Sequence, residues 1–454
     1  MNNNIKESIL KHDRMVPRYT SYPTAPHFKS GATQDWYRKE LEKIPARSPI
    51  SLYVHVPFCS QLCWFCGCHT RVTSRYSAVG DYTDWLLQEL SMLVPILAPK
   101  RLEVRYLHFG GGSPTMLRPS DFRRIVSRLR KIGDFTRDDL GVSVEIDPRA
   151  ASADKLSAYQ KCGVNRASLG VQDFNQQVMN AVNRSQDYDT CKRATDMCRA
   201  HGINNVNIDL MYGLPYQTRD SIRKTAEQAL TLEPQRISLF GYAHVPWMKK
   251  HMRLIQEDAL PSVEDRLDLF EDAAEVFENA GYVPIGIDHF CKESDNLVTA
   301  LRSNCLSRNF QGYTDDNCPY LLAVGASGIS RLGDVYVQNY VHLPPYRDRV
   351  LSGQFPFDKY CEMTESDKIR ARVIEKMMCN LSVNPLGEAA GMGIPDHDFS
   401  GVYESIMPLV RDGLAQISSD GTVHALARQS ARLICASFDQ YLPHSSEARH
   451  VTSS

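Results

Sequence analysis

Four cysteines lie within one ten-residue stretch, Cys59-Ser-Gln-Leu-Cys63-Trp-Phe-Cys66-Gly-Cys68, directly after the apolar run 52–57. The C-x-x-x-C-x-x-C part of this stretch constrains the chain more than any other feature. Three thiolates so close in sequence can hold three irons of a [4Fe–4S] cube, whereas full thiolate ligation needs a fourth cysteine. If Cys68 is not a ligand, one iron keeps an open coordination position, which separates reactive metal sites from structural ones.

A structural zinc site is the main alternative for this loop. It could use Cys59, Cys63 and Cys66 with Cys68 or His69, but zinc modules usually split their ligands into two well-separated pairs. A disulfide-bonded loop fits less well, because disulfides need suitable Cα spacings and an oxidising compartment. We therefore predict a [4Fe–4S] cluster held by the first three cysteines and leave the role of Cys68 open.

Composition is typical of an ordinary globular protein. The chain has 454 residues, of which 43% are hydrophobic and 23% charged, and its net charge is −1. This balance gives no reason to expect nucleic acid or an anionic membrane as a partner. No run approaches the ~18 apolar residues of a membrane span, and residues 1–7 lack the apolar core of a signal peptide. Thirteen cysteines then fit a reducing compartment, so we expect a cytoplasmic protein. We also expect it to be a monomer.

Strand patterns alternate with helical patterns through the first half of the chain. The predicted strands are rich in β-branched or aromatic residues and cover 51–57, 103–109, 141–147, 166–171, 205–211 and 236–242. Helices with apolar residues at three- and four-residue intervals are predicted at 81–98, 119–132, 153–162, 187–201 and 218–232. Six strand–helix units in this order imply a parallel sheet with right-handed crossovers. With a helix at 262–280 and strands at 282–288 and 322–331, they predict an α/β fold, an incomplete (β/α) barrel.

Residues beyond about 360 change character. Helices are predicted at 364–380 and 402–413, followed by a hairpin at 414–424 and a final helix at 427–440. This order resembles a winged-helix module, but its residues are not strongly basic, so we expect a lid and not a DNA-binding domain. The predicted division is an N-terminal covering segment, a barrel with an extension, and a small, mostly helical C-terminal domain, at residues 1–48, 49–360 and 361–454.

Polar residues and glycines follow the predicted strands at their carboxyl ends, where barrel enzymes build their active sites. These ends carry Cys59, Gly110-Gly111-Gly112, Glu145, Gln172, Asp209 and Ala243. A glycine run lets backbone approach a ligand, although alone it can equally be a tight turn. The two carboxylates could bind a ribose or an amino group, and helix caps or salt bridges are their structural alternatives.

Three further side chains could complete such a site. Arg184 could bind a carboxylate through its bidentate fork. Tyr53 and Phe65 flank the cysteine loop, and core packing is the alternative role of both rings.

Taken together, the motifs resemble the oxygen-independent coproporphyrinogen III oxidases, a family of the radical S-adenosylmethionine (SAM) superfamily. The resemblance covers roughly residues 15–440. Its carriers are the cysteine loop and the segments 109–115, 171–175, 182–184, 207–210, 212–215 and 309–313. The segment Pro17-Arg-Tyr-Thr-Ser-Tyr-Pro-Thr24 also matches, and it separates these oxidases from shorter relatives such as the haem chaperone branch.

The resemblance implies two cofactors, one [4Fe–4S] cluster on Cys59, Cys63 and Cys66, and two molecules of SAM. One SAM site would be lined by Tyr53, Gly111, Glu145 and Ile329. A second, adjacent SAM site would be lined by Phe65, Gly112, Ser113, Gln172, Arg184, Asp209 and Ala243. Arg18 lies on the segment that would close over a tetrapyrrole substrate. The family commonly has Thr at the position of Ser113 and Tyr at that of Trp64.

The activity implied is oxidative decarboxylation of two propionates of coproporphyrinogen III to vinyl groups, giving protoporphyrinogen IX through a SAM-derived 5′-deoxyadenosyl radical. No general-base histidine is then expected, while an unidentified electron donor and electron acceptor are required. A radical SAM methyltransferase-type paralogue and a haem chaperone on the same fold are alternatives, as is a paralogue that has lost turnover. Loss of two CO₂, gain of a methyl group, or haem retention without oxidation would distinguish them.

Overall fold

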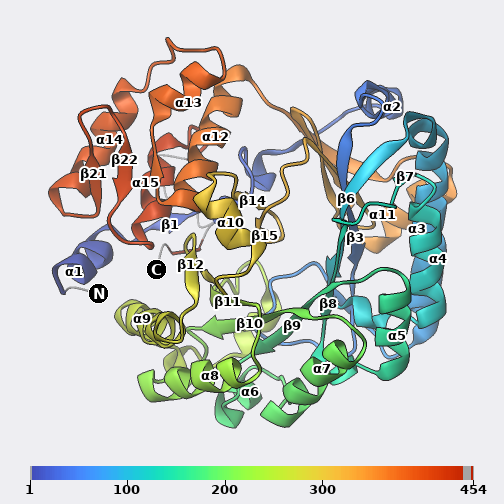
Figure 1. Ribbon diagram of the computed structural model, residues 1–454, viewed down its shortest axis with the longest axis horizontal. Coiled ribbons are helices and arrows are strands. Elements are labelled where there is room, and N and C mark those ends of the chain that lie inside the picture. The colour runs from blue at the N-terminus through green and yellow to red at the C-terminus, as the bar shows by residue number, and fades with distance from the viewer. Residues whose placement is uncertain (1–2, 443–450, 453–454) are drawn as a thin grey trace.

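A computed structural model describes residues 3–442 and 451–452 of the chain. Its centre is one large mixed sheet whose middle is parallel (Figure 1). The parallel strands are neighbours in sequence order: β3 (Pro49–Val56), β6 (Leu102–Gly111), β8 (Gly141–Ile146), β9 (Arg166–Gln172), β10 (Asn205–Tyr212) and β11 (Arg236–Gly241). The six strands predicted from sequence are therefore confirmed, in the predicted order.

Both edges of the parallel region are extended. Beside β11 lie the antiparallel strands β13 (His289–Cys291) and β12 (Val283–Ile285). On the other side β16 (Tyr320–Val324) runs parallel to β3, and an antiparallel series follows: β17 (Ile329–Leu332), β18 (Val335–Asn339), β19 (Phe357–Glu362) and β2 (Lys29–Ser30). Within the described residues β12 and β2 do not pair, so the barrel stays open, as predicted.

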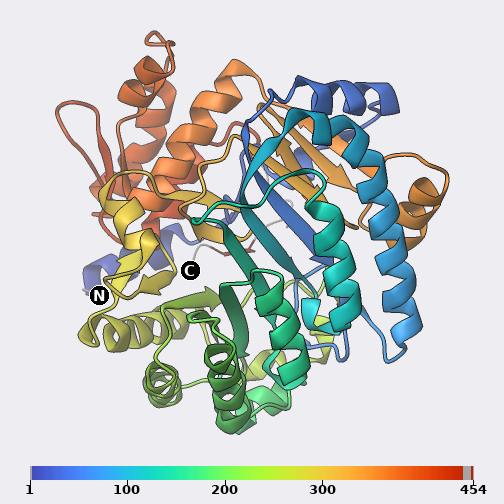
Figure 2. The ribbon, with the colours of Figure 1, turned by 45° about the vertical axis from the view of Figure 1, so that its right-hand side comes forward.

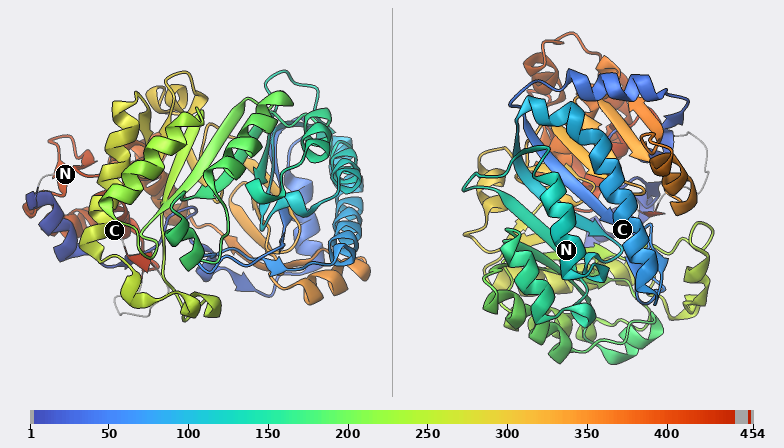
Figure 3. Two further views of the ribbon diagram at one scale, coloured as in Figure 1. Left: turned by 90° about the horizontal axis from the view of Figure 1, so that it is seen from below. Right: turned by 90° about the vertical axis from the view of Figure 1, so that its right-hand side faces the viewer.

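Helices cover the outer face of this sheet (Figures 1 and 3). They are α3 (Tyr76–Leu97), α4 (Pro119–Leu129), α5 (Ala153–Lys161), α7 (Tyr188–Ala200), α8 (Arg219–Thr231) and α9 (Val263–Asn279). Each was predicted, with boundaries that differ by at most a few residues. The start of α8 shows how the local sequence sets a helix boundary. The Thr218 side chain accepts a hydrogen bond from the Ser221 amide, and the Ser221 hydroxyl accepts one from the Thr218 amide, which fixes the first turn.

The middle strands alternate in burial, and this alternation positions the site. In β8 and β9 every second residue is buried, and those residues, such as Val144 and Leu169, join the main hydrophobic core beneath the helices. The residues between them, including Glu145 and Ser168, point to the inner face. Parallel sheets covered on both faces usually read as continuous apolar runs, so a polar inner face indicates that this side of the sheet holds a site.

The C-terminal region forms a group of helices beside the large sheet (Figure 2) and has its own hydrophobic core. It contains α12 (Glu365–Asn380), α13 (Pro385–Gly391), α14 (Ser400–Arg411), α15 (Ser430–Phe438) and a small sheet of β20 (Ser382–Val383), β22 (Val423–Ala425) and β21 (Ala415–Ile417). The predicted helices and hairpin are confirmed. The N-terminal helix α1 (Asn3–His12), which the sequence did not predict, joins this core through Ile9.

The N-terminal segment is bound to the end of the chain. Strand β1 (Met15–Val16) pairs antiparallel with β23 (Val451–Thr452), and the Arg432 side chain donates to the carbonyls of Val16 and Pro17. Residues 1–2, 443–450 and 453–454, which the predicted domains include, lie outside the described residues. The division into three domains stays a prediction.

The remaining elements are short or connect the main ones. The helices are α2 (Gln34–Lys43), α6 (Gln176–Ala181), α10 (Asn296–Arg302) and α11 (Leu343–Leu351). The strands are β4 (Phe58–Cys59), β5 (Arg71–Val72), β7 (Gly133–Asp134), β14 (Ser307–Asn309) and β15 (Gly312–Thr314). No described helix combines the length and the apolar character that crossing a bilayer would require.

One buried carboxylate ties α3 to the distal part of the sheet. The Glu89 side chain accepts hydrogen bonds from the Tyr346 hydroxyl at 2.6 Å, the Gly325 amide at 2.8 Å and the Asn339 side chain at 2.7 Å. Burial raises the pKa of Glu89 to about 7 despite these three bonds. The unfolded chain would therefore lose this proton at a lower pH than the folded chain does.

Glu89 should make the protein less stable as the pH rises. Below pH about 4.5 the Glu89 carboxyl is neutral in both the folded and the unfolded chain. Between that pH and about pH 7 it ionises in the unfolded chain but stays neutral in the folded chain, which lowers the free energy of unfolding by about 3 kcal/mol. We expect Glu89→Gln to remove most of this decline, whatever its effect on stability at pH 5. Denaturant unfolding of both proteins between pH 5 and 8 measures the slope. Parallel slopes would mean that Glu89 does not titrate in this range.

Candidate active site

The cysteine loop follows β3 at the carboxyl edge of the sheet. Strand β4 ends at Cys59 and pairs in parallel with β5, so the residues between them form a closed loop. Two backbone hydrogen bonds hold the loop: the Cys66 amide donates to the Cys63 carbonyl at 3.1 Å, and the Trp64 amide donates to the Val182 carbonyl at 2.9 Å. The chain thus presents all the cysteines of the loop from one short, anchored turn.

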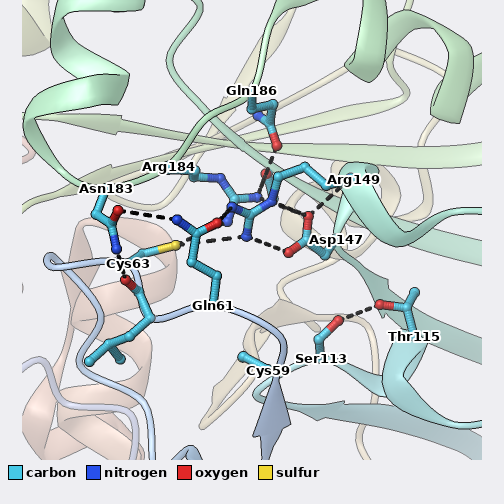
Figure 4. Close-up of polar contacts among 12 residues, drawn as sticks. Cys59, Gln61, Cys63, Ser113, Thr115, Asp147, Arg149, Asn183, Arg184 and Gln186 are labelled. Atoms are coloured by element: carbon cyan, nitrogen blue, oxygen red, sulfur yellow. Dashed lines mark hydrogen bonds and ion pairs between the residues drawn. The ribbon is translucent and has the colours of Figure 1, made fainter. Parts of the chain in front are cut away.

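Two arginines surround the most buried of these thiols (Figure 4). Arg184 lies 3.4 Å from the Cys63 sulfur through Nη1, and Arg149 lies 4.0 Å from it through Nη2. Asp147 pairs with both guanidinium groups, at 3.6 Å and 2.7 Å respectively. Two cations against one carboxylate leave a net positive charge beside Cys63.

The other thiols differ in their surroundings. The Thr70 hydroxyl donates to the Cys59 sulfur at 3.3 Å, but burial raises the pKa of Cys59 to about 11. Hydrogen bonding from the Cys68 side chain lowers the pKa of Cys66 to about 7. Cys68 therefore lies against the Cys66 thiol, and metal binding by Cys59 would release its proton.

The geometry bears on the zinc alternative. Among residues 3–442, no group of three or more histidine, cysteine or acidic side chains converges as a single metal ion would require. A zinc site needs its ligands around one centre, whereas thiolates that bind different irons of a cube need not converge at one point. The three cysteines, with donors to two of their sulfurs, fit an iron–sulfur cluster.

Close packing explains Gly111, the last residue of β6, and Gly112, which follows it. A Cβ atom at Gly112 would lie 2.4 Å from the Thr70 hydroxyl and 2.7 Å from the Phe58 carbonyl. One at Gly111 would lie 2.8 Å from the His55 ring, and the φ angle of Gly111 is +121°. These glycines let the end of β6 lie directly against the strand that leads into the cysteine loop, so packing within the chain already requires them.

Three of the four residues predicted for the first SAM site lie together. Glu145 accepts from the Gly111 amide at 3.0 Å and contacts His108 Nε2 at 3.2 Å. The Tyr53 ring stacks on His108, with ring centroids 5.7 Å apart. His108, which the sequence did not single out, therefore links the two predicted residues. Ile329 begins β17 and lines a cavity of about 410 Å³; the hydroxyl of its neighbour Ser330 accepts from the amide of Ala323, which pairs with Tyr53.

The residues predicted for the second SAM site divide into two sets. Phe65, Gln172, Asp209 and Ala243 line one cavity of about 580 Å³, together with Cys66, Gly67 and Cys68. Gly112, Ser113 and Arg184 do not line it. The Ser113 amide donates to the Phe58 carbonyl at 2.8 Å, and its buried side chain bonds to Thr115.

Two residues that line this cavity are unusual: Gln172 in its backbone conformation and Asp209 in its pKa. Gln172 has a φ angle of +73°, opposite an irregularity in the pairing of β10 with β9. A non-glycine residue in this region is strained, and such strain concentrates at functional sites. Asp209 accepts from the side chains of Ser168 and Asn207, both at 2.7 Å, and burial raises its pKa.

Arginines dominate the far wall of the same cavity. Five arginines line it, against only two acidic residues: Arg18, Arg266, Arg308, Arg428 and Arg432, with Asp209 and Asp288. They come from the N-terminal segment, α9, β14 and the start of α15. Of these arginines the sequence predicted only Arg18, whose exposed side chain donates to the Gly241 carbonyl at 3.1 Å.

Arg308 is held by an aromatic ring and a carboxylate. Its guanidinium lies 4.4 Å from the centre of the Tyr313 ring and 3.7 Å from Asp288. Although burial opposes ionisation, Arg308 and His289 lower the pKa of Asp288 to about 2, so both partners stay charged. The Nε atom of Arg308 is buried and has no hydrogen-bond partner within the described part of the chain. The cavity thus keeps a net positive charge and an unused donor.

Comparison with known proteins identifies relatives. The family model described as the radical SAM superfamily matches residues 53–229. The chain is 40% identical to the oxygen-independent coproporphyrinogen III oxidase of Bradyrhizobium diazoefficiens over 433 residues, 95% of each chain. It is 40% identical to the anaerobic coproporphyrinogen III oxidase 1 of Cereibacter sphaeroides, covering 99% of this chain and 98% of that one.

A solved structure agrees with these relatives. It is the coproporphyrinogen III oxidase of Escherichia coli, described as a radical SAM enzyme, and superposes with a TM-score of 0.88 at 36% identity. The match covers 94% of this chain and 98% of that chain. The similarity therefore extends through the barrel and well into the regions before and after it.

Proposed function

The chain belongs to the family of oxygen-independent coproporphyrinogen III oxidases, and we propose on this basis that it oxidatively decarboxylates two propionates of coproporphyrinogen III. The product would be protoporphyrinogen IX. The observation that carries this proposal is the cavity of about 580 Å³ in which five arginines face the cysteine loop. A substrate with four carboxylates needs such a surplus of cations, whereas neutral substrates do not.

The cysteine loop fits the group that this chemistry needs. We propose that Cys59, Cys63 and Cys66 bind a [4Fe–4S] cluster, with Thr70 and Arg184 donating to two of the sulfurs. When bound, the cluster and SAM supply the one-electron cleavage of SAM that makes hydrogen abstraction from an unactivated carbon possible. The chain itself supplies binding, orientation and charge.

Two neighbouring groups of residues support two SAM molecules. The first group is Tyr53, Gly111 and Glu145, where the carboxylate is already held by a backbone amide and His108. The second is Phe65, Gln172, Asp209 and Ala243, on the wall of the substrate cavity. A carboxylate in each group can bind a ribose hydroxyl or the amino group of SAM.

The arginines have a separate role, which is to hold the substrate. Arg308 and Arg432 are fixed by Asp288 and by backbone carbonyls, so they can form a rigid wall that receives propionates. Arg18 lies on the N-terminal segment and can close the entrance. The cavity is lined from all three predicted domains, which supports the predicted use of the two terminal regions as covers.

Anaerobic assay of reconstituted protein with dithionite, SAM and coproporphyrinogen III tests this function. We expect protoporphyrinogen IX and 5′-deoxyadenosine to form together. A product that gains a methyl group would indicate a methyltransferase, and retention of haem without decarboxylation would indicate a chaperone. Either result would overturn the proposed reaction.

Substitution of Arg18 tests the closure of the cavity. We expect Arg18→Ala to lower kcat/KM about 10- to 100-fold, the effect of losing one charged hydrogen bond, and to leave the iron content unchanged. Arg14→Ala is the matched control, because Arg14 is exposed on the same segment and does not line the cavity. Equal kcat/KM values for Arg18→Ala and the unmodified protein would remove the closure role.

A further inference from the structure

The segment between β11 and α9 contacts the cysteine loop directly. Lys249 donates through Nζ to the Cys68 carbonyl at 3.1 Å, and His251 Nε2 lies 2.8 Å from the Cys66 carbonyl. Cys66, Gly67 and Cys68 of the loop, with Val245 and Met252 of the segment, line the arginine cavity, whereas Trp247, Met248 and Leu254 do not. If substrate fills that cavity, the segment offers a way to approach the cluster that substrate does not block.

The outer surface of this segment is unusually apolar. Trp247, Met248 and Leu254 are 51%, 60% and 57% exposed. The segment is nevertheless anchored, because Met252 and Ile255 are buried in a hydrophobic cluster that Phe65 of the cysteine loop also contacts. Its exposed apolar residues thus lie on a fixed surface, and such patches mark interaction sites.

The surface of this segment carries positively charged side chains. Lys249, Lys250 and Arg253 lie among the apolar residues, and the nearest acidic residues along the chain are Glu257, which contacts His244 at 3.1 Å, and Asp258. None of the three cations is in a recorded ion pair with a carboxylate in the described parts of the chain. The whole chain carries a net charge of −1, so this concentration of positive charge is local.

We propose that residues 247–254 form the docking surface for the one-electron donor, a small acidic protein with a low-potential flavin or iron–sulfur centre. The proposal rests on the proposed function, in which the oxidised cluster must gain one electron for each SAM cleaved. In the docking complex the donor centre loses that electron and the cluster gains it, and no covalent bond changes.

The shape and charge of the surface suit this class of partner. Redox complexes are small and short-lived, so a few exposed apolar residues are enough contact area. The surrounding cations raise the association rate of an acidic partner and make it depend on salt. Because the segment bonds to the backbone of Cys66 and Cys68, a protein docked on it comes close to the cluster.

The test uses the reconstituted holoenzyme with two probes, a flavodoxin and an acidic [2Fe–2S] ferredoxin, each in reduced form. The variants are Lys250→Glu with Arg253→Glu, and separately Trp247→Ala with Met248→Ala. Lys131→Glu with Lys161→Glu is the control, because both lysines are exposed on distant parts of the barrel. Calorimetry measures binding at low and high salt, stopped-flow absorbance measures cluster reduction, and turnover is followed with dithionite.

We expect either double variant to weaken probe binding and slow cluster reduction at least ten-fold, while the control and dithionite-driven turnover stay unchanged. Only the charge-reversal effect should vanish at high salt. Failure of the unmodified enzyme to bind either probe, or unaltered binding by both variants, would overturn the proposal. The proposal would also be overturned if the unmodified enzyme and the control bound anionic lipid vesicles and only the two double variants did not. Failure of the unmodified enzyme with dithionite would instead count against the proposed function.

Discussion

Replacement of Cys63 by serine is expected to remove the cluster and to reduce turnover below detection, whereas Cys68→Ser keeps both. Cys63 is the most buried thiol of the loop, and its sulfur receives the Arg184 guanidinium at 3.4 Å. A serine there offers no soft ligand to iron. At position 68 a serine hydroxyl can still donate to Cys66, so the environment of that ligand is retained.

Iron and sulfide analysis with the EPR spectrum of the reduced protein distinguishes the two variants. A Cys68→Ser protein that loses its cluster as fully as Cys63→Ser would show that four thiolates ligate the cube. No iron would then remain open for SAM, and the proposed reaction would need another chemistry. Zinc in the unmodified protein, prepared anaerobically and active, would have the same consequence.

The second large effect is expected for Arg184→Met. The substitution removes a cation and a donor from the Cys63 sulfur and leaves the Gly170 carbonyl and Gln186 without their partner. Breaking a buried network of this kind costs about 3–5 kcal/mol. The reduction potential of the cluster should also fall, because donors to cluster sulfurs favour the more negative, reduced state.

Arg149→Met is the matched control, because Arg149 also pairs with Asp147 but lies farther from the sulfur, at 4.0 Å. We expect it to shift the potential less than Arg184→Met does. Potentiometric titration followed by EPR measures both shifts, and Arg184→Lys should recover part of the loss. Equal shifts in the two methionine variants would show that overall charge, and not the bond to Cys63, sets the potential.

The parallel sheet could be predicted because its strands are encoded locally. Segments such as 141–147 and 205–211 combine β-branched residues with clear boundaries, and the helices between them show regular apolar spacing. The cysteine loop is equally local. Helix α1 and strand β2 were missed, because they pack against residues hundreds of positions away in the chain.

The cavity could not be predicted for a related reason. Arg266, Arg308 and Arg428 carry no local sign of a shared role, since they lie in a helix, a short strand and a turn. Only folding brings them to one wall with Arg18. Ile329 was grouped with Tyr53 and Glu145 by family resemblance alone, and that assignment stays a prediction.

The contact of Arg432 with the carbonyls of Val16 and Pro17 joins the two ends of the chain and can form only late in synthesis. Val16 and Pro17 are translated among the first residues, yet their carbonyls await the Arg432 guanidinium. A ribosome that has finished the barrel has therefore made a complete cysteine loop but not its cover. The wall of the cavity that Arg18 and Arg432 share can therefore be completed only after residue 432 has been translated.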